Sequence, residues 1–204
     1  INVKKKILND NKRQIKRLKS YGDLEFIIET NDSSNLDVIK TIIDLKEKKY
    51  IETGYNMFEN KQYKSLYLNC NKNLDKLGNL HISTLRIKNK IIAGHWGFCS
   101  KDTFYYIMPS YETGIWAKYS PGKILLEYLM EWACKNGIKK FDFTEGYATY
   151  KKNWSNTKSI LHSTIVPINL KANLVLFIHK LKDIIPDKLN KIIKLIFYKI
   201  YRLF

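Results

Sequence analysis

The chain has 204 residues, of which 45% are apolar, and its formal net charge at pH 7 is +17. The apolar share is enough for a hydrophobic core, which excludes an intrinsically disordered chain, and Lys or Arg interrupts every long apolar stretch, which excludes a membrane-spanning helix. The positive charge predicts an anionic partner, such as nucleic acid, anionic lipid or a phosphate-bearing small molecule. The lysine and asparagine usage of an AT-rich genome is an alternative source of part of this charge.

The first part of the chain has the pattern of a helix, a strand and two further helices. Its predicted elements are a basic helix over residues 3–19 that ends near Gly22, a strand over 24–29, a helix from 36 onward with N-cap residues at 31–34, and a helix over 63–77. The glycine is a typical C-cap residue, and the apolar positions of the later helices recur every three or four residues.

The middle of the chain changes to the alternating pattern of β-strands. Three antiparallel strands are predicted over 82–88, 91–98 and 103–108, with tight turns at Asn89-Lys90 and 100–102. The later elements are a helix over 120–136, a strand over 138–144, a short helical segment over 147–154, a last strand over 159–168 and two basic helices divided by Pro186.

This order predicts an α+β fold with a central, mostly antiparallel sheet flanked by helices. We expect a basic N-terminal helix over residues 1–22, a globular domain over 23–168 and basic amphipathic helices over 169–204. Because the chain begins at Ile1 and shows no signal segment, we expect a cytoplasmic piece of a longer protein.

The cysteines and histidines indicate no metal site. Cys70, Cys99 and Cys134 lie far apart and match no metal or redox spacing, and the histidines form no ligand set with them. We predict small buried cysteines in a reducing compartment, and no metal.

The segment from Lys118 to Lys123 predicts an anion site at a helix start. Ser120 suits the N-cap, and the proline that follows it suits the first helical position. Gly122 has no Cβ, so a ligand can approach the backbone, and we expect a bulky residue there to block the ligand without disturbing the fold. The free N–H groups and the helix dipole attract anions, although an ordinary Ser-Pro helix start is the structural alternative.

A longer series of motifs resembles a known family. Ser-Pro-Gly at 120–122, an apolar helix ending in Asn-Gly at 136–137, Phe-Asp-Phe at 141–143 and Tyr-Lys-x-x-Trp at 150–154 resemble the GNAT acetyltransferases of polysaccharide-biosynthesis loci. These are relatives of the Fem-type aminoacyl transferases. The resemblance is strongest over 91–156, and it implies a GNAT-like fold and a degenerate GNAT-like half before this one.

The resemblance also implies roles for individual residues. Lys118, Tyr119, Ser120, Gly122 and Lys123 correspond to the loop that holds the pyrophosphate of coenzyme A, although this chain lacks the usual second glycine. Tyr150 and Lys151 resemble the aromatic-lysine pair at the reaction centre of Fem-type enzymes. The Lys151 ammonium would stabilise an oxyanion or hold a phosphate, and a solvated helix lysine is the structural alternative.

Acidic and aromatic residues near these motifs complete the predicted site. Glu145, at the end of the predicted strand, is the candidate general base, and a regular strand would point Asp142 to the opposite face. Asp142, His95 and Trp96 are candidate substrate contacts. Ordinary structural roles are the alternatives, with His95 hydrogen-bonded inside the sheet and Asp142 paired with a buried partner.

The sequence therefore predicts an N-acyltransferase that moves an acyl group, acetyl in the first instance, from acyl-CoA to an amine of a surface-polysaccharide or cell-envelope precursor. A Fem-type aminoacyl-tRNA-dependent transferase and a non-catalytic basic module that binds nucleic acid or membrane are the alternatives. Residues 187–204 have an apolar helical face flanked by lysines, which suits either peripheral contact with an anionic membrane or packing on the domain or on the absent N-terminal half.

Overall fold

The computed structural model describes residues 3–177 except 30–34, 55, 75–78, 163, 165, 171 and 174–175. The chain forms two compact units, Ile1–Lys158 and Ser159–Phe204. All helices and strands discussed below belong to the first unit. In the second unit, the described residues of 159–168 form no strand, so the predicted last strand is wrong for them. The described residues of this segment are largely exposed, the apolar Ile160, Leu161 and Val166 among them, and the five-stranded sheet does not include them.

The first unit is built on one sheet of five strands in the order β1-β2-β3-β4-β5. These strands are β1 (Leu24–Ile28), β2 (Leu80–Ile87), β3 (Lys90–Ser100), β4 (Thr103–Tyr111) and β5 (Lys140–Asp142). Neighbours from β1 to β4 are antiparallel, whereas β5 runs parallel to β4. A parallel pair needs a crossover, and the long helix between the two strands provides it. The predicted mixed fold with a mostly antiparallel sheet is confirmed.

The hairpin between β2 and β3 has a two-residue turn. Lys88 and Asn89 both have positive φ, 46° and 65°, which matches the turn type that suits the twist of a hairpin. The turn therefore lies one residue earlier than the Asn89-Lys90 turn predicted from the sequence.

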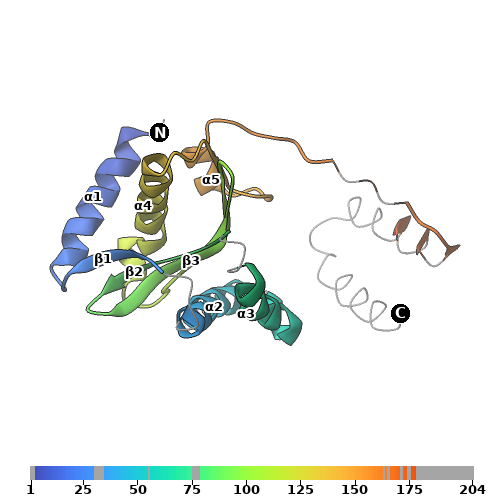
Figure 1. Ribbon diagram of the computed structural model, residues 1–204, viewed down its shortest axis with the longest axis horizontal. Helices are drawn as coiled ribbons and strands as arrows, with labels where there is room; N and C mark the ends of the chain where they lie inside the picture. The colour runs from blue at the N-terminus through green and yellow to red at the C-terminus, as the bar shows by residue number, and fades with distance from the viewer. Residues whose placement is uncertain are drawn as a thin grey trace, which may run out of the picture. The chain divides into compact units, whose positions relative to one another are not determined.

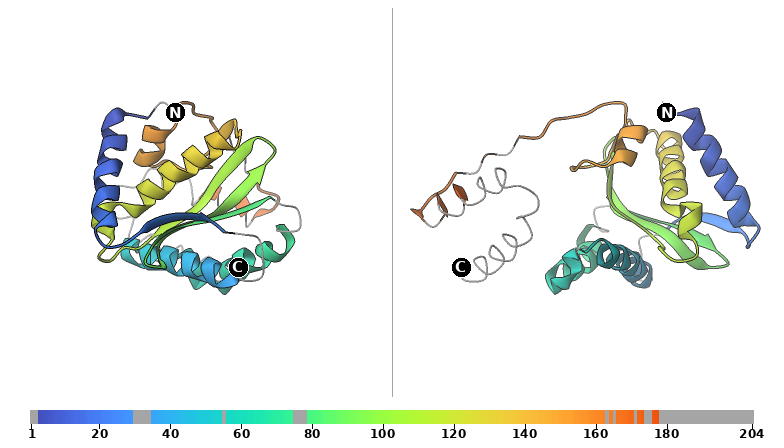
Figure 2. Two further views of the ribbon diagram at one scale, coloured as in Figure 1. Left: turned by 60° about the vertical axis from the view of Figure 1, so that its left-hand side comes forward. Right: turned by 180° about the vertical axis from the view of Figure 1, so that it is seen from behind.

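Helices cover both faces of the sheet. They are α1 (Lys5–Lys19), α2 (Leu36–Thr53), α3 (Lys61–Leu74), α4 (Pro121–Lys135) and the short α5 (Thr149–Trp154). Figures 1 and 2 show α2 and α3 on one face and α1 with α4 on the other. Within the described residues, no helix is both long and apolar enough to cross a bilayer.

Two apolar clusters hold these layers together. Ile39, Ile42 and Ile43 of α2 pack with sheet residues that include Trp96 and Met108. The second cluster lies under α4 and also contains Leu18 of α1, which is fully buried. The basic helix α1 is thus packed on the same core as α4. The Asn11 amide also donates to the Glu127 carboxylate, at 2.5 Å, and so joins the two helices.

Candidate active site

Strands β4 and β5 stop pairing halfway along β4. Their register joins Thr103–Tyr105 to Lys140–Asp142, and β4 then continues to Tyr111 paired with β3 but not with β5. The chain beyond Asp142 leaves the sheet and leads into α5. The second half of β4 and the segment 143–151 therefore diverge from a common point, and the predicted catalytic residues Glu145, Tyr150 and Lys151 lie on the second of these segments.

Asp142 fixes the place where the chain leaves the sheet. Its Oδ1 accepts the Thr144 N–H at 2.8 Å, and its Oδ2 lies 2.9 Å from Nζ of Lys140. The hydrogen bond from Lys140, helped by the Thr144 N–H, lowers the pKa of Asp142. Because β5 ends here and Thr144 has a φ of 59°, the strand predicted over 138–144 is too long. Glu145 lies in the exposed loop beyond the strand, so strand alternation does not decide where it points.

Lys151 contacts the loop that follows β5 and is close enough to two carboxylates for their charges to act on its pKa. Its Nζ donates to the backbone carbonyl of Glu145 at 2.6 Å, and the side chain is half-buried. Burial lowers the pKa of Lys151, while the charges of Asp142 and Glu145 act in the opposite direction. The structure therefore brings Asp142, Glu145 and Lys151 together. Lys152, the next residue on α5, is exposed.

Aromatic rings pack between β4 and α5. Phe143 lies between Tyr106 and Tyr150, with ring centroids 5.7 Å and 6.3 Å away, respectively. Burial raises the pKa of Tyr150, and the nearby Tyr111 raises it further. The Tyr150 hydroxyl is therefore protonated at neutral pH, next in sequence to Lys151.

A second lysine, from α2, lies near Lys151 and was not predicted from the sequence. Nζ of Lys46 donates to the carbonyl of Pro109 on β4 at 3.0 Å and lies 5.4 Å from the ring centroid of Tyr50. Burial lowers the pKa of Lys46, and the charge of Lys151 lowers it further. No sequence motif marks Lys46, because only the packing of α2 against β4 brings it to this place.

Helix α4 begins at the predicted residues, but Ser120 does not cap it as predicted. Ser120 is the N-cap and Pro121 the first helical residue, yet the Ser120 side chain makes no capping bond and its φ is 54°. The Ser120 carbonyl accepts the N–H groups of Lys123 and Ile124, and proline has no N–H. Within the described chain, these bonds leave the Gly122 N–H as the donor of the first turn.

Gly122 packs against the last residue of β4. A Cβ on Gly122 would lie 2.8 Å from Cδ1 of Tyr111, which is closer than real contacts allow. The expectation that a bulky residue here would leave the fold undisturbed is therefore wrong, because the missing Cβ serves a contact inside the protein. Tyr111 also raises the pKa of Tyr150, so the side chain in contact with Gly122 is a neighbour of the aromatic-lysine pair as well.

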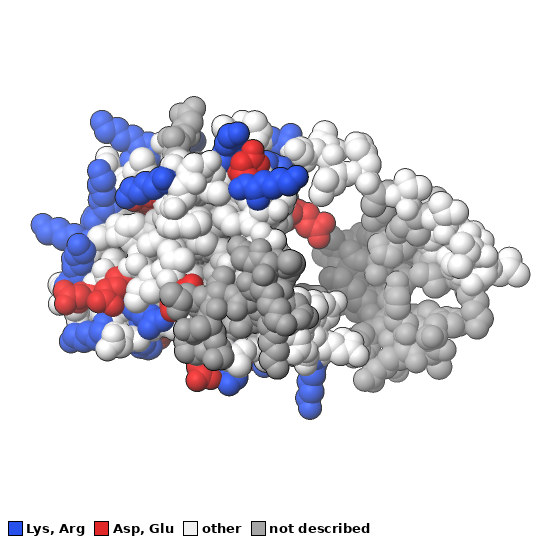
Figure 3. Space-filling model, in the orientation of Figure 1, with Lys and Arg blue, Asp and Glu red and all other residues white. Residues whose placement is uncertain are grey.

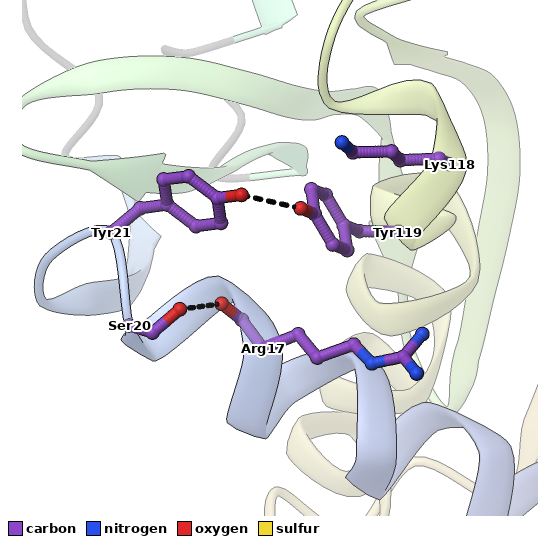
Figure 4. A pocket seen from close by; sticks show the side chains of 5 residues that line it. All are labelled: Arg17, Ser20, Tyr21, Lys118 and Tyr119. Carbon is purple, nitrogen blue, oxygen red and sulfur yellow. Dashed lines mark hydrogen bonds between the residues drawn. The ribbon is translucent and has the colours of Figure 1, made fainter.

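Lys118 and Tyr119 face α1 and not the start of α4. They line a surface pocket of about 380 Å³ together with Arg17, Ser20 and Tyr21 (Figure 4). The hydroxyls of Tyr21 and Tyr119 are hydrogen-bonded at 2.7 Å. The three residues from the α1 side were not predicted, since the two tyrosines are 98 positions apart in the sequence and only tertiary packing joins them.

His95 and Trp96 are buried within the layers that cover the sheet. His95 is fully buried, and its ring stacks on Tyr106 at 4.8 Å; Trp96 is 3% exposed and packs under α2 and α3. A substrate could touch either side chain only if this packing opened, so their role as substrate contacts stays a prediction. Burial lowers the pKa of His95 well below its usual value.

The described part of the chain contains no set of side chains that could bind a metal ion. No group of three His, Cys, Asp or Glu side chains there is arranged to hold an ion. The three cysteines are free thiols, and Cys134 is exposed.

The sequence matches one known family over most of its length. Residues 5–152 fit the profile of the family described as "Acetyltransferase (GNAT) domain". This match starts within α1 and ends within α5, so it includes both the start of α4 and Lys151. No curated protein matches the chain.

The chain also aligns with solved structures of acetyltransferases. A GNAT family acetyltransferase of Staphylococcus aureus aligns over 70% of this chain and 98% of its own, with 17% identity and a TM-score of 0.46. An aminoglycoside acetyltransferase from an uncultured soil metagenomic sample, in complex with sisomicin, aligns over 76% of this chain and 99% of its own, with 14% identity and a TM-score of 0.50. At such low identity the second likeness concerns the fold alone.

Proposed function

This chain belongs to the acetyltransferase (GNAT) domain family, and from that membership we propose that it transfers an acyl group, acetyl in the first instance, from coenzyme A to an amino group. The observation that best supports the proposal is the position of Tyr111. It packs against Gly122 at the start of α4 and lies near Tyr150. This one side chain is therefore a neighbour of both the predicted coenzyme A site and the predicted reaction centre.

The residues at the start of α4 suit the anionic part of such a donor. The Gly122 N–H and the positive end of the helix dipole favour a phosphate, and the exposed Lys123 adds positive charge in the first turn. We propose that Ser120, Gly122 and Lys123 hold the pyrophosphate, with the Ser120 hydroxyl as an additional donor because no capping bond occupies it.

The reaction forms a C–N bond to the acceptor amine and breaks the C–S bond of the thioester. The amine loses one proton, and the exposed Glu145 carboxylate is the proposed base that takes it. The Lys151 ammonium, 2.6 Å from the Glu145 carbonyl, is the proposed stabiliser of the oxyanion. The leaving sulfur needs one proton, and the Tyr150 hydroxyl is the proposed source because burial keeps it protonated.

An amine on a surface-polysaccharide or cell-envelope precursor is the proposed acceptor, and Asp142 its proposed contact. The resemblance at Ser120–Gly122 and Tyr150–Lys151 supports this acceptor. The Tyr150–Lys151 pair also supports an aminoacyl-tRNA donor, which is the second candidate. The many lysines and arginines of α1 also favour that second candidate, because positive side chains bind the phosphate backbone of a nucleic acid such as tRNA.

Three further proposals rest on the sequence: a cytoplasmic location, packing on an N-terminal half, and contact of residues 187–204 with anionic membrane. Residues 178–204 lie outside the part of the chain that the structure describes. The contact with membrane would come from the apolar face of that segment and its flanking lysines.

A thermal-shift experiment separates the two donors. A ligand that binds only the folded state raises the melting temperature, by an amount that grows with its concentration over Kd. We expect a rise with acetyl-CoA and none with charged tRNA. A rise with charged tRNA alone would favour the aminoacyl transferase, and a rise with neither would leave the non-catalytic basic module as the better account.

A further inference from the structure

We propose that the pocket between the end of α1 and the turn before α4 binds a phosphate monoester on a nucleoside, which in coenzyme A is the 3′-phosphate. The pocket is lined by Arg17, Ser20, Tyr21, Lys118 and Tyr119. This inference rests on the proposed function and extends it, because it gives the donor a second anion site formed partly by α1.

The charge of the pocket favours an anion. Arg17 and Lys118 are both exposed, and no acidic residue lines the pocket. In the described part of the chain neither takes part in an ion pair, whereas Arg13, one turn earlier on α1, is paired with Asp10 at 2.5 Å. Two unpaired cations on one concave surface are a typical phosphate site, and the arginine can bind two phosphate oxygens at once.

The two cations come from different elements and converge on one ring. Figure 4 shows Arg17 on α1 and Lys118 in the turn before α4, with Tyr119 between them. Nζ of Lys118 lies 5.1 Å from the centroid of the Tyr119 ring. The hydrogen bond from Tyr21 lowers the pKa of Tyr119, and the charges of Lys118 and Arg17 lower it further, so both cations act on the same place.

The aromatic rings offer a surface for the nucleoside. Tyr21 is 46% exposed although its hydroxyl bonds to Tyr119 and its ring meets Trp116 edge-on at 5.3 Å. The ring is therefore held in place on one side and open to solvent on the other. A base that stacks on such a fixed tyrosine loses little side-chain entropy on the protein side.

The pocket adjoins the proposed pyrophosphate site in the chain itself. Lys118 and Tyr119 directly precede Ser120, the N-cap of α4. A ligand with one phosphate group at the start of α4 and another in the pocket therefore needs two anionic groups in one molecule. Coenzyme A has this arrangement, with a 5′-pyrophosphate and a 3′-phosphate on one ribose.

Cations on the surface near the pocket supply a further attraction. Figure 3 shows Lys and Arg side chains along the edge where α1 lies. The exposed cations of the last turns of α1 include Lys16, Arg17 and Lys19. Lys19 does not line the pocket, so it provides a control with the same charge on the same helix end.

Calorimetry with the whole chain can test the pocket through a ligand pair that differs by one phosphate. We would measure Kd for coenzyme A and for 3′-dephospho-coenzyme A with the wild type, Arg17→Ala, Lys118→Ala and Lys19→Ala. Since a charge-assisted hydrogen bond is worth about one to two powers of ten in Kd, the wild type should bind coenzyme A about 10- to 100-fold more tightly than the dephospho form. That ratio should fall toward one in Arg17→Ala and Lys118→Ala, and persist in Lys19→Ala.

The outcomes distinguish this inference from the proposed function. Equal binding of both ligands to the wild type, or a ratio that neither Arg17→Ala nor Lys118→Ala reduces, would overturn the pocket assignment and leave the donor proposal standing. A ratio that Lys19→Ala reduces as much would also overturn it, because the effect would then be general charge. Failure of both ligands to bind the wild type would overturn the proposed function itself.

Discussion

At the scale of single residues, Lys151 differs in its contacts from an ordinary surface lysine. It is half-buried, donates to the Glu145 carbonyl at 2.6 Å, and lies close enough to Asp142 and Glu145 for their charges to act on its pKa. The sequence alone left a solvated lysine as an equal alternative. The neighbouring Lys152 has none of these contacts within the described structure, and so it offers a matched control.

We predict that Lys151→Ala lowers turnover of acetyl-CoA with an amine acceptor by at least about a hundredfold, the usual cost of losing an oxyanion donor. Lys152→Ala should stay near the wild-type rate. Steady-state kinetics on both variants provides the measurement, with melting temperatures as a check that the 143–148 loop has not unfolded. Equal and mild losses in the two variants would return Lys151 to the role of a solvated lysine.

The burial of His81 makes the free energy of unfolding depend on pH. Burial lowers the pKa of His81 from 6.5 to about 4, so the folded protein holds it neutral where the unfolded chain would protonate it. Between these two values the unfolded state binds more protons, and stability therefore falls as pH decreases from about 6.5 toward 4. The full effect of this one group is about 3 kcal/mol.

His81→Phe should remove that contribution. The imidazole lies among Phe104 and Trp132, with ring centroids at 4.9 Å and 4.3 Å, so another aromatic ring suits the site. We expect the variant to lose less free energy of unfolding than the wild type between pH 7 and pH 4.5 in urea titrations followed by circular dichroism. An unchanged pH dependence would show that His81 is already protonated, or exposed, in the folded protein.

At the scale of elements, the start of α4 shows what a sequence can and cannot predict. Ser120 and Pro121 mark the first turn through local backbone preferences, and the structure confirms both positions. The neighbour of Gly122 was not predictable in this way. Tyr111 reaches it only because β4 extends beyond its pairing with β5, and no local pattern shows where a strand loses its partner.

Gly122→Ala tests that contact. The added Cβ would lie 2.8 Å from Tyr111, so either the ring or the first turn of α4 must move. We predict a loss of about 1–3 kcal/mol in the free energy of unfolding, which is typical of overpacking. Tyr111→Leu in the same chain should recover part of the loss, since a smaller side chain leaves room for the methyl group. A variant as stable as the wild type would contradict the packing of Gly122 on Tyr111.

The same contrast holds for the other elements. Hydrophobic periodicity predicted the meander, the helix over 120–136 and the fold class, because these depend on local spacing. The strand at 138–144 proved shorter, since Asp142 bonds the Thr144 N–H and turns the chain away from the sheet. Lys46, Arg17 and Tyr21 reach their sites through packing between distant segments, which is why no motif marked them.

At the scale of the whole molecule, α1 connects the excess of positive charge to the catalytic domain. Leu18 is fully buried under the same core as α4, and Asn11 bonds Glu127 at 2.5 Å, while the cations of α1 stay exposed. The family match also begins at residue 5, within this helix. The boundary predicted after residue 22 remains a prediction about the chain, and the packing indicates that α1 and the sheet stabilise each other.

The most direct test of this account is the reaction itself. Purified protein would be mixed with acetyl-CoA and a panel of amino sugars and sugar-nucleotide amines, with release of the free thiol followed over time and products identified by mass. We predict thiol release that depends on an amine, a product heavier by one acetyl group, and loss of both in Lys151→Ala but not in Lys152→Ala. Thiol release at the same rate without any amine, or no acetylated product from any amine while charged tRNA supplies an aminoacyl group, would contradict it.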